Sequence, residues 1–436
     1  MTTARISTPP LPPTNPRRTN PTSLTIVLKL GTTSICDEQT HLPKLSTLSL
    51  LVETIVHLRS AGHKIVLVSS GAVGVGLRRL GLDRRPKHLA VKQAVAAVGQ
   101  GRLMALYDGL FAQFDVPIAQ VLLTRENLAE RTQYLNACNT FKELLLMNVV
   151  PIVNENDTVS NAEIRFGDND TLSAITAGMV NADYLFLMTD VDCLYTDNPK
   201  TNPDARPVRV VEDVGELRDK VTVSSPGSHL GTGGMVTKLV AADLATAAGC
   251  TTIITLSHPP LIPTILAEIQ SHTPNTPFCP THGTHFLPRP NAMMDRKWWI
   301  LHGLKSFGAI YLDKGAVRAV LNRHRSSLFA AGVARVEGTF NAQQCVRLLT
   351  IIQNNDTQTV IEIGKGLVNY SFAECLRIKG HKSSEIEGLL GYVDSGCVVH
   401  RDNLVITHRD VDFTSIVLEG VSRRGSEEDN GPCASG

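Results

Sequence analysis

The sequence predicts an α/β protein with a mostly parallel, open sheet sandwiched by helices, followed by a smaller, mainly β domain. Three observations lead to this prediction. Apolar, β-branched runs alternate with helix-length amphipathic segments from residue 24 to about residue 256. Eight prolines then punctuate residues 257–294 and interrupt the alternation. After them, short β-like runs are separated by glycines and charged turns.

Six segments have the near-continuous apolar character of strands that are buried on both faces. They are residues 24–30, 64–69, 117–123, 149–153, 184–188 and 251–256. Helices are predicted between and after them, at 44–61, 87–113, 134–147, 170–180, 235–249 and 261–270. Gly249 ends one of these helices as a C-terminal cap would. The pattern therefore predicts one α/β domain over residues 24–272.

The remaining segments are assigned by composition. Residues 1–23 contain six prolines and no acidic residue, which predicts a disordered tail. Residues 273–294 are predicted to be a linker, and 413–436 a flexible tail. The second domain is expected over 295–412, with strands at 308–312, 333–340, 346–352, 359–363 and 397–406 and one helix near 372–378.

The overall composition excludes some classes of function. Hydrophobic residues make up 42% of the 436 residues, and 42 Lys and Arg balance 41 Asp and Glu. A net charge of +1 gives no indication of nucleic acid or an anionic membrane as a partner. No apolar run approaches the roughly 18 residues of a membrane-spanning helix. Nine cysteines without a CxxC pair predict free thiols, and we expect a cytoplasmic protein.

Small, polar or charged residues stand where the predicted strands end and helices begin. In an open parallel sheet these are the positions at which ligands bind. The segments are Lys29-Leu30-Gly31-Thr32-Thr33-Ser34, Ser69-Ser70-Gly71, Asn154-Glu155-Asn156-Asp157, Gly167-Asp168-Asn169-Asp170, Thr189-Asp190 and Gly231-Thr232-Gly233-Gly234-Met235-Val236-Thr237-Lys238.

Two common nucleotide-binding motifs do not fit these segments. The glycines at 71, 74 and 76 follow the second strand with the reverse of the GxGxxG spacing, and neither glycine-rich loop reads GxxxxGK[ST]. Lys29 and Lys238 each lie beside a glycine-rich turn, and two such cations suit a polyphosphate. The acid and amide side chains around Asp157 and Asn169 suit an amino group.

No metal site is predicted from the sequence. Cys279, His282 and His285 lie in the proline-rich stretch, lack a clear fourth ligand and are more tightly spaced than the ligands of structural zinc sites.

The chain carries six long motifs in a fixed order: IVLKLGTTS, IVLVSSGAVGVG, PIVNENDTV, FGDNDTLSA, LMTDVDCLYTDNP and LGTGGMVTKLVAADLATAAG. Together they resemble the amino-acid kinase family over residues 24–272, and within it most closely the kinases that act on L-glutamate. The later segments WWILHG, GAIYLDKGA, SLFAAGV and VVHRDNLVI resemble the PUA-type domain that follows the kinase domain in those enzymes.

The resemblance implies ATP-dependent phosphorylation of the γ-carboxylate of L-glutamate to L-glutamyl 5-phosphate, the first step of proline biosynthesis, with Mg²⁺. It implies that Lys29 and Lys238 hold the transferring phosphoryl group and that Asp170 orients the two lysines. Ser70, Asp157 and Asn169 match the glutamate site. The nucleotide-binding positions are Lys29, Thr189, Asp190, Thr232, Gly233, Gly234, Met235, Val236, Thr237 and Lys238.

Other interpretations stay open at this point. Asp168 or Asp170 could serve as a cap for the helix that begins near residue 170. The enzyme could be another carboxylate kinase, acting on acetylglutamate or aspartate. A different class, an RNA-binding factor that uses the PUA-like domain, is disfavoured because that domain has nearly balanced charge. The resemblance also implies a homo-oligomer and inhibition by proline.

Overall fold

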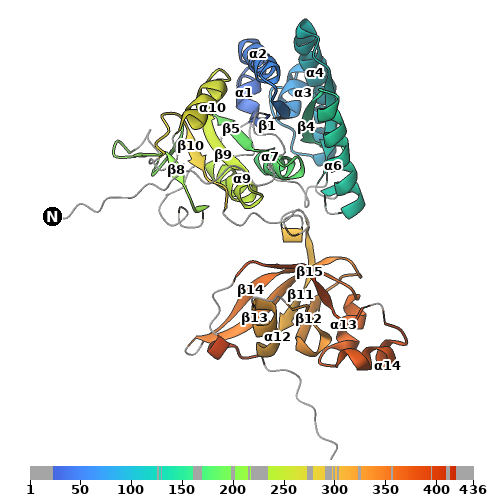
Figure 1. Ribbon diagram of the computed structural model, residues 1–436. Helices are drawn as coiled ribbons and strands as arrows, with labels where there is room; N and C mark the ends of the chain where they lie inside the picture. The colour runs from blue at the N-terminus through green and yellow to red at the C-terminus, as the bar shows by residue number, and fades with distance from the viewer. Residues whose placement is uncertain are drawn as a thin grey trace, which may run out of the picture. The chain divides into compact units, whose positions relative to one another are not determined.

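A computed structural model of the protein consists of two compact units, Met1–Asp295 and Arg296–Gly436 (Figure 1). The structure describes residues 23–124, 127–128, 130–160, 169–197, 202–214, 217, 234–272, 278–289, 297, 300–301, 304–322, 326–354, 357–393, 395–408 and 413–418. The predicted tail at 1–23 lies outside these residues except for Ser23. The same holds for 419–436 of the second predicted tail.

The first unit is built on an eight-stranded sheet with the order β3-β4-β2-β1-β5-β9-β10-β8. Its six longest strands coincide with the six predicted ones and pair in parallel, which confirms the predicted fold class. Their bounds are β1 Thr25–Leu30, β2 Lys64–Ser69, β3 Ile118–Leu123, β4 Val150–Glu155, β5 Tyr184–Thr189 and β9 Thr251–Leu256.

Helices cover the two faces of this sheet in separate groups. Apolar side chains of α2, α4 and α10 share a buried core with alternate residues of β1 and β2. On the other face, α7 packs on β1 and β5, and α9 packs on β9 and against α7. The helices are α1 Thr32–Ile35, α2 Leu45–Ser60, α3 Ala72–Leu80, α4 Leu89–Phe111, α6 Arg131–Leu146, α7 Asn169–Met179, α9 Met235–Ala247 and α10 Leu261–Ser271.

The stretch 273–294 differs from the linker that its composition predicts. Strand β10, Thr284–Phe286, lies within it and pairs antiparallel with β9 and parallel with β8, Val210–Val211. Its three residues are fully or almost fully buried. A strand this short shows no periodicity in the sequence, and the flanking prolines hide it, although prolines are tolerated just outside a strand. A two-stranded ribbon of β6, Leu194–Tyr195, and β7, Pro207–Val208, adjoins it through Thr284.

The second unit is a five-stranded mixed sheet with the order β12-β11-β13-β14-β15. The strands are β11 Ser306–Leu312, β12 Val333–Gly338, β13 Cys345–Asn354, β14 Thr357–Val368 and β15 Val399–Ile406. The predicted helix is α13, Phe372–Ile378. The sequence missed α12, Lys314–Leu321, and α14, Ile386–Leu390, because helices of eight and five residues are too short to establish a helical period. A core of its own confirms the second, mainly β domain.

Ordered structure in this unit extends beyond residue 412, into the segment that the sequence assigned to the tail. Ile416 is buried and forms a bridge with Ile352 of β13, and the Val417 N–H donates to the Ile351 carbonyl at 3.0 Å. Phe413 and Leu418 also pack against buried clusters of this unit, but three apolar residues in so short a segment give no clear period in the sequence. Across the part of the chain that the structure describes, no helix has the length and apolar character to cross a membrane.

Candidate active site

Lys29 lies on the face of the sheet that α7 and α9 cover. Its neighbours in β1, Leu28 and Leu30, point into the core beneath α2, α4 and α10. Because side chains alternate along a strand, Lys29 points to the opposite face. Only 4% of its surface is exposed. A lysine this deeply buried requires a partner, and Asp170 supplies it.

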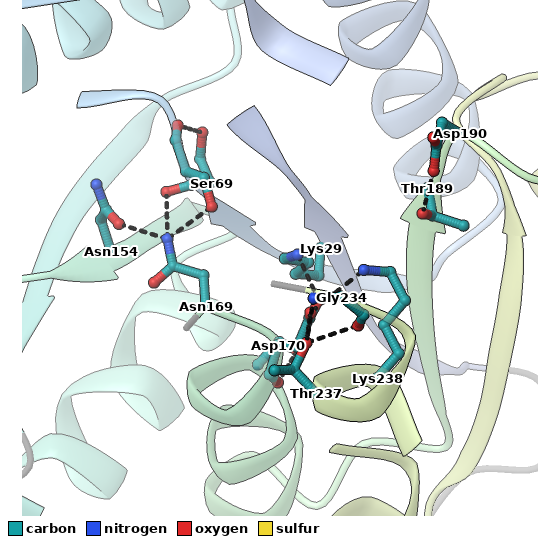
Figure 2. A network of polar contacts seen from close by, with 12 residues as sticks. Lys29, Ser69, Asn154, Asn169, Asp170, Thr189, Asp190, Gly234, Thr237 and Lys238 are labelled. Carbon is teal, nitrogen blue, oxygen red and sulfur yellow. Dashed lines mark hydrogen bonds and ion pairs between the residues drawn. The ribbon is translucent and has the colours of Figure 1, made fainter. Parts of the chain in front are cut away.

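Asp170 holds both predicted lysines. One carboxylate oxygen, Oδ1, forms an ion pair with Lys29 Nζ, and the other, Oδ2, lies 3.3 Å from Lys238 Nζ (Figure 2). The Thr237 hydroxyl lies 2.8 Å from the same Oδ2. Asp170 is fully buried and Lys238 is 7% exposed. The three charged side chains therefore form one buried cluster with an excess positive charge.

The charges of this cluster determine the protonation state of Asp170. Burial alone would raise the pKa of the carboxyl group, because it penalises the charged form. The positive charges of Lys29 and then Lys238, together with hydrogen bonds from Lys29 and Thr237, outweigh burial and hold the pKa below its ordinary value. Asp170 is therefore an anion at neutral pH, and its carboxylate holds the two lysine ammonium groups in place.

The N-terminus of α9 positions Lys238. Gly234 precedes the helix in an extended conformation, and its N–H donates to Thr237 Oγ1 at 3.0 Å. This contact places the threonine hydroxyl beside Asp170, and Lys238 follows one residue later. Gly234 and Met235 are half-buried, whereas Val236 is exposed. Thr232 and Gly233 lie outside the described residues.

A second, uncharged cluster surrounds Asn169. Its side-chain Nδ2 donates to Ser70 Oγ at 2.8 Å and to Asn154 Oδ1 at 2.9 Å (Figure 2). Asn154 in turn donates from its Nδ2 to Gln100 Oε1 at 2.8 Å. The cluster therefore joins the ends of β2 and β4 to the first residue of α7. The structure brings two predicted residues, Ser70 and Asn169, into direct contact.

The turn after β2 depends on Gly71. Its φ of +101° is in the left-handed region, and it precedes α3 as the N-terminal cap residue. A Cβ atom at this position would lie 3.2 Å from the Ile35 side chain. Glycine thus allows the chain to turn sharply into the helix directly after Ser70, and it leaves the serine at the end of the strand.

Thr189 ends strand β5 and Asp190 follows it, on the other side of β1 from the Asn169 cluster. The strand order β4-β2-β1-β5 places Asn154, Ser70, Lys29 and Thr189 in that sequence along one edge of the sheet. In Figure 2, Lys29 and Lys238 lie between Asn154 and Ser69 on one side and Thr189 and Asp190 on the other. Thr189 Oγ1 donates to Asp190 Oδ1 at 3.0 Å, and Asp190 is exposed.

Asp157 lies in the turn after β4 and is half-buried. Its assignment to the substrate site stays a prediction. Sequence reasoning missed the roles of Asn154 and Gln100. Asn154 stands in the same motif as Asp157 and could have been included, because it also follows a predicted strand. Gln100 lies inside α4, where no local pattern distinguishes it.

The histidines of the proline-rich stretch have structural contacts. His285 belongs to β10, and its Nε2 lies 3.0 Å from the His282 carbonyl oxygen. Its ring also meets the edge of Phe278 at a centroid distance of 5.2 Å. Among the described residues, no group of three or more His, Cys, Asp or Glu is arranged to hold a metal ion.

Both units are similar in sequence to known protein families. Residues 24–256 match the amino acid kinase family, and residues 308–390 match the PUA domain. A protein of Schizosaccharomyces pombe named "Probable glutamate 5-kinase" is 54% identical over 398 residues, which cover 90% of this chain and 96% of that protein. The "Glutamate 5-kinase" of Nostoc sp. is 51% identical over 384 residues, 88% of this chain and 97% of that protein.

Among solved structures, the carbamate kinase from Giardia lamblia bound to AMP-PNP matches 61% of this chain and 98% of its own, with 16% identity and a TM-score of 0.43. The family match covers more than half of the chain, the two named relatives are similar along nearly all of it, and the observed fold and site residues agree with the sequence motifs. The chain therefore belongs to the amino acid kinase family, with a PUA domain in its second unit.

Proposed function

We propose that this protein is a glutamate 5-kinase, which transfers the γ-phosphoryl group of ATP to the γ-carboxylate of L-glutamate in the first step of proline biosynthesis. The observation that carries this proposal is the position of the Asn169 cluster directly beside the buried pair of lysines. The Asn169 cluster offers hydrogen-bond partners to a small polar substrate, and the two lysines offer positive charge to a phosphate. The glutamate 5-kinases that resemble the chain over 88–90% of its length support the same reaction.

The chemistry requires no general base. A glutamate side chain has a pKa of about 4.3, so at neutral pH it is already an anionic nucleophile. The principal obstacle is repulsion between this carboxylate and the γ-phosphate. Lys29 and Lys238 supply positive charge where the two anions approach, and Asp170 holds both ammonium groups in place before the substrates bind.

The polarity of the Asn169 cluster suits the amino end of glutamate. Nδ2 of Asn169 donates to Ser70 and Asn154, so the amide oxygen is the atom directed to other partners. Amide and carboxylate oxygens accept hydrogen bonds from an ammonium group. Asn169 and Asp157 are therefore assigned to the α-ammonium group, and Ser70 to a carboxylate.

ATP and Mg²⁺ are expected as cosubstrate and cofactor. Mg²⁺ is usually bound by one or two carboxylates together with substrate phosphates and water, and it would neutralise developing charge on those phosphates. Both oxygens of Asp170 are engaged by lysines, so this carboxylate is not free to bind the ion. The cation would accordingly be carried mainly by the nucleotide.

The proposal is tested by trapping the acyl phosphate with hydroxylamine in reactions that contain ATP, Mg²⁺ and one candidate acceptor. Glutamate-dependent hydroxamate and ADP formation is expected. An acyl phosphate formed from acetylglutamate or aspartate, but not from free glutamate, would replace the proposal with another carboxylate kinase.

Two further properties are proposed from the resemblance to the family. Proline is expected to inhibit the reaction as a feedback effector, and the protein is expected to be a homo-oligomer. Titrating proline into the assay tests the first, and sedimentation equilibrium tests the second. RNA binding is not favoured, and the absence of salt-dependent RNA retention by the full chain would agree with that assessment.

A further inference from the structure

Three polar side chains of α4 recur at intervals of seven residues: Gln93, Gln100 and Tyr107. Seven residues are close to two turns of an α-helix, so the three lie on nearly the same side of α4, about 10 Å apart along its axis. We call them the α4 polar stripe. Gln93 and Gln100 are half-buried, and Tyr107 is fully buried.

Each member of the α4 polar stripe contacts a different part of the substrate side of the site. Gln93 Nε2 donates to the Ser160 carbonyl at 3.2 Å, in the segment that follows Asp157. Gln100 Oε1 accepts from Asn154 Nδ2 at 2.8 Å, at the end of β4. The Tyr107 hydroxyl lies 2.9 Å from Ser69 Oγ, at the end of β2 and directly before Ser70.

The direction of the hydrogen bonds through Asn154 is fixed by the backbone. The Glu155 N–H donates to Asn154 Oδ1 at 2.9 Å, and a backbone N–H cannot act as an acceptor. Asn154 must therefore present Nδ2 to Gln100 and Oδ1 to Asn169. Gln100 in turn presents its oxygen, and Asn169 its Nδ2. The orientation of the Asn169 amide thus depends on Asn154, which the Glu155 N–H holds on one side and Gln100 of α4 holds on the other.

Close backbone contacts with α3 hold α4 in position. A Cβ atom on Gly99 would lie 1.7 Å from the Ala72 carbonyl oxygen, and one on Gly76 would lie 2.0 Å from the Val95 carbonyl oxygen. These two glycines let the backbones of α3 and α4 touch, in a contact that tolerates little displacement. Since α3 begins directly after Ser70 and Gly71, the contact fixes α4 relative to Ser70.

We infer that the α4 polar stripe positions the glutamate-binding residues: Gln100 holds Asn154, the partner of Asn169, in place, and Tyr107 holds the end of β2 beside Ser70. This inference rests on the proposed function. Neither side chain touches the lysine cluster in any of these contacts, so they are positioning residues for the acceptor and not for the nucleotide. Their loss should weaken glutamate binding while nucleotide binding stays nearly unchanged.

The test compares Gln100→Met and Tyr107→Phe with the unaltered enzyme in the hydroxylamine assay. Both changes keep the shape of the side chain and remove its hydrogen-bonding atoms. Each should raise the KM for glutamate about fivefold, the effect of one lost neutral hydrogen bond, and leave the KM for ATP within twofold. Gln100→Glu keeps an acceptor oxygen toward Asn154 and should restore most of the glutamate affinity.

Gln113→Met is the matched control. Gln113 lies in η1, Ala112–Phe114, directly after α4, where it is exposed and makes a local bond to the Gly109 carbonyl. The Gln113→Met substitution should leave the KM values for glutamate and for ATP unchanged. If Gln100→Met changed the two KM values in parallel, or if Gln113→Met reproduced its effect, the stripe would be a structural feature only and the inference would fail. If the unaltered protein formed no hydroxamate from glutamate, the proposed function itself would fail.

Discussion

Asn169 and Asp170 are consecutive in the chain, yet their side chains belong to different halves of the site. Asn169 donates to Ser70 and Asn154, whereas Asp170 pairs with Lys29 and Lys238. Successive residues of an α-helix point about 100° apart, so the first turn of α7 can direct one side chain to each cluster. The Asn169 cluster, proposed to bind the acceptor, and the lysine cluster, proposed to bind phosphate, are therefore joined by a single peptide unit.

The first prediction concerns the lysines. Lys29→Met and Lys238→Met should each lower kcat by about 10²–10³-fold, because each removes one preorganised cation from the charge that develops during transfer. The KM for glutamate should change much less. Steady-state kinetics with both substrates varied will measure this. A variant that retained near-normal kcat would exclude its lysine from the transfer step.

Asp170→Asn should separate nucleotide binding from turnover. Removing the carboxylate leaves two buried ammonium groups without their shared anion, which should cost about 3–5 kcal/mol of unfolding free energy. ATP supplies the missing negative charge, so the nucleotide should raise the Tm of the variant more than that of the unaltered protein. At the same time kcat should fall, because the lysines are no longer held in position.

The depressed pKa of Asp170 sets the pH range of this effect. A carboxylate whose folded pKa lies below its ordinary value of 3.8 stabilises the protein above that value, and the contribution is lost as the pH falls through the folded pKa. The difference in unfolding free energy between the unaltered protein and Asp170→Asn should therefore be constant from pH 8 to about pH 5. A difference that already shrank between pH 7 and pH 5 would contradict the assignment.

Asp157→Asn should act on the acceptor alone. The carboxylate is assigned to the α-ammonium group of glutamate, so its neutralisation should raise the KM for glutamate about tenfold, as expected for the loss of a charge-assisted hydrogen bond. The KM for ATP should remain within twofold. An unchanged KM for glutamate would remove Asp157 from the substrate site.

The site residues that the sequence predicted share one property: they lie in local motifs where predicted strands end or helices begin. Lys29 and Ser70 were proposed because parallel strands bring their carboxyl ends to one edge, and Asp170 because it stands at the start of a predicted helix. The bridging role of Asp170 came from the family resemblance, because a helix cap was an equally reasonable local interpretation. Gln100 could not be found, since its role exists only once α4 is packed beside β4.

The strands of the first unit also fall into those that a local pattern predicts and those that it does not. Six strands of six residues each were predicted because their apolar runs are long enough to recognise. The three-residue β10 was not, because its burial depends on pairing with β9 and β8, which are distant in the sequence or separated by other elements. The formation of so short a strand depends on its tertiary contacts and not on a local sequence pattern.

The contact between α3 and α4 gives a prediction with a built-in control. Gly99→Ala would place a Cβ atom against the Ala72 carbonyl, whereas Gly101→Ala, two residues later on the same helix, meets nothing within 4 Å. Gly101→Ala should stabilise the protein by about 0.5–1 kcal/mol through helix propensity. Gly99→Ala should instead destabilise it, by about 1–3 kcal/mol, because the helices must separate. Urea unfolding of both variants will decide; equal effects would contradict the close contact.

His285 provides the last prediction. Burial lowers its pKa from 6.5 to about 4, and the groups that act on its charge besides burial are the His282 carbonyl and ring, Glu268 and Arg209. A histidine with a depressed folded pKa is protonated more readily in the unfolded chain. The free energy of unfolding should therefore decrease as the pH falls from about 6.5 toward 4.

A fully buried histidine with this shift accounts for a loss of roughly 2 kcal/mol between pH 7 and pH 5. His285→Gln keeps an amide donor for the His282 carbonyl but does not titrate, so its stability should depend on pH less steeply by that amount. Urea unfolding at the two pH values measures the difference, with His57→Gln, at an exposed position of α2, as the control. Parallel pH dependence of His285→Gln and the unaltered protein would show that His285 is not held neutral in the folded state.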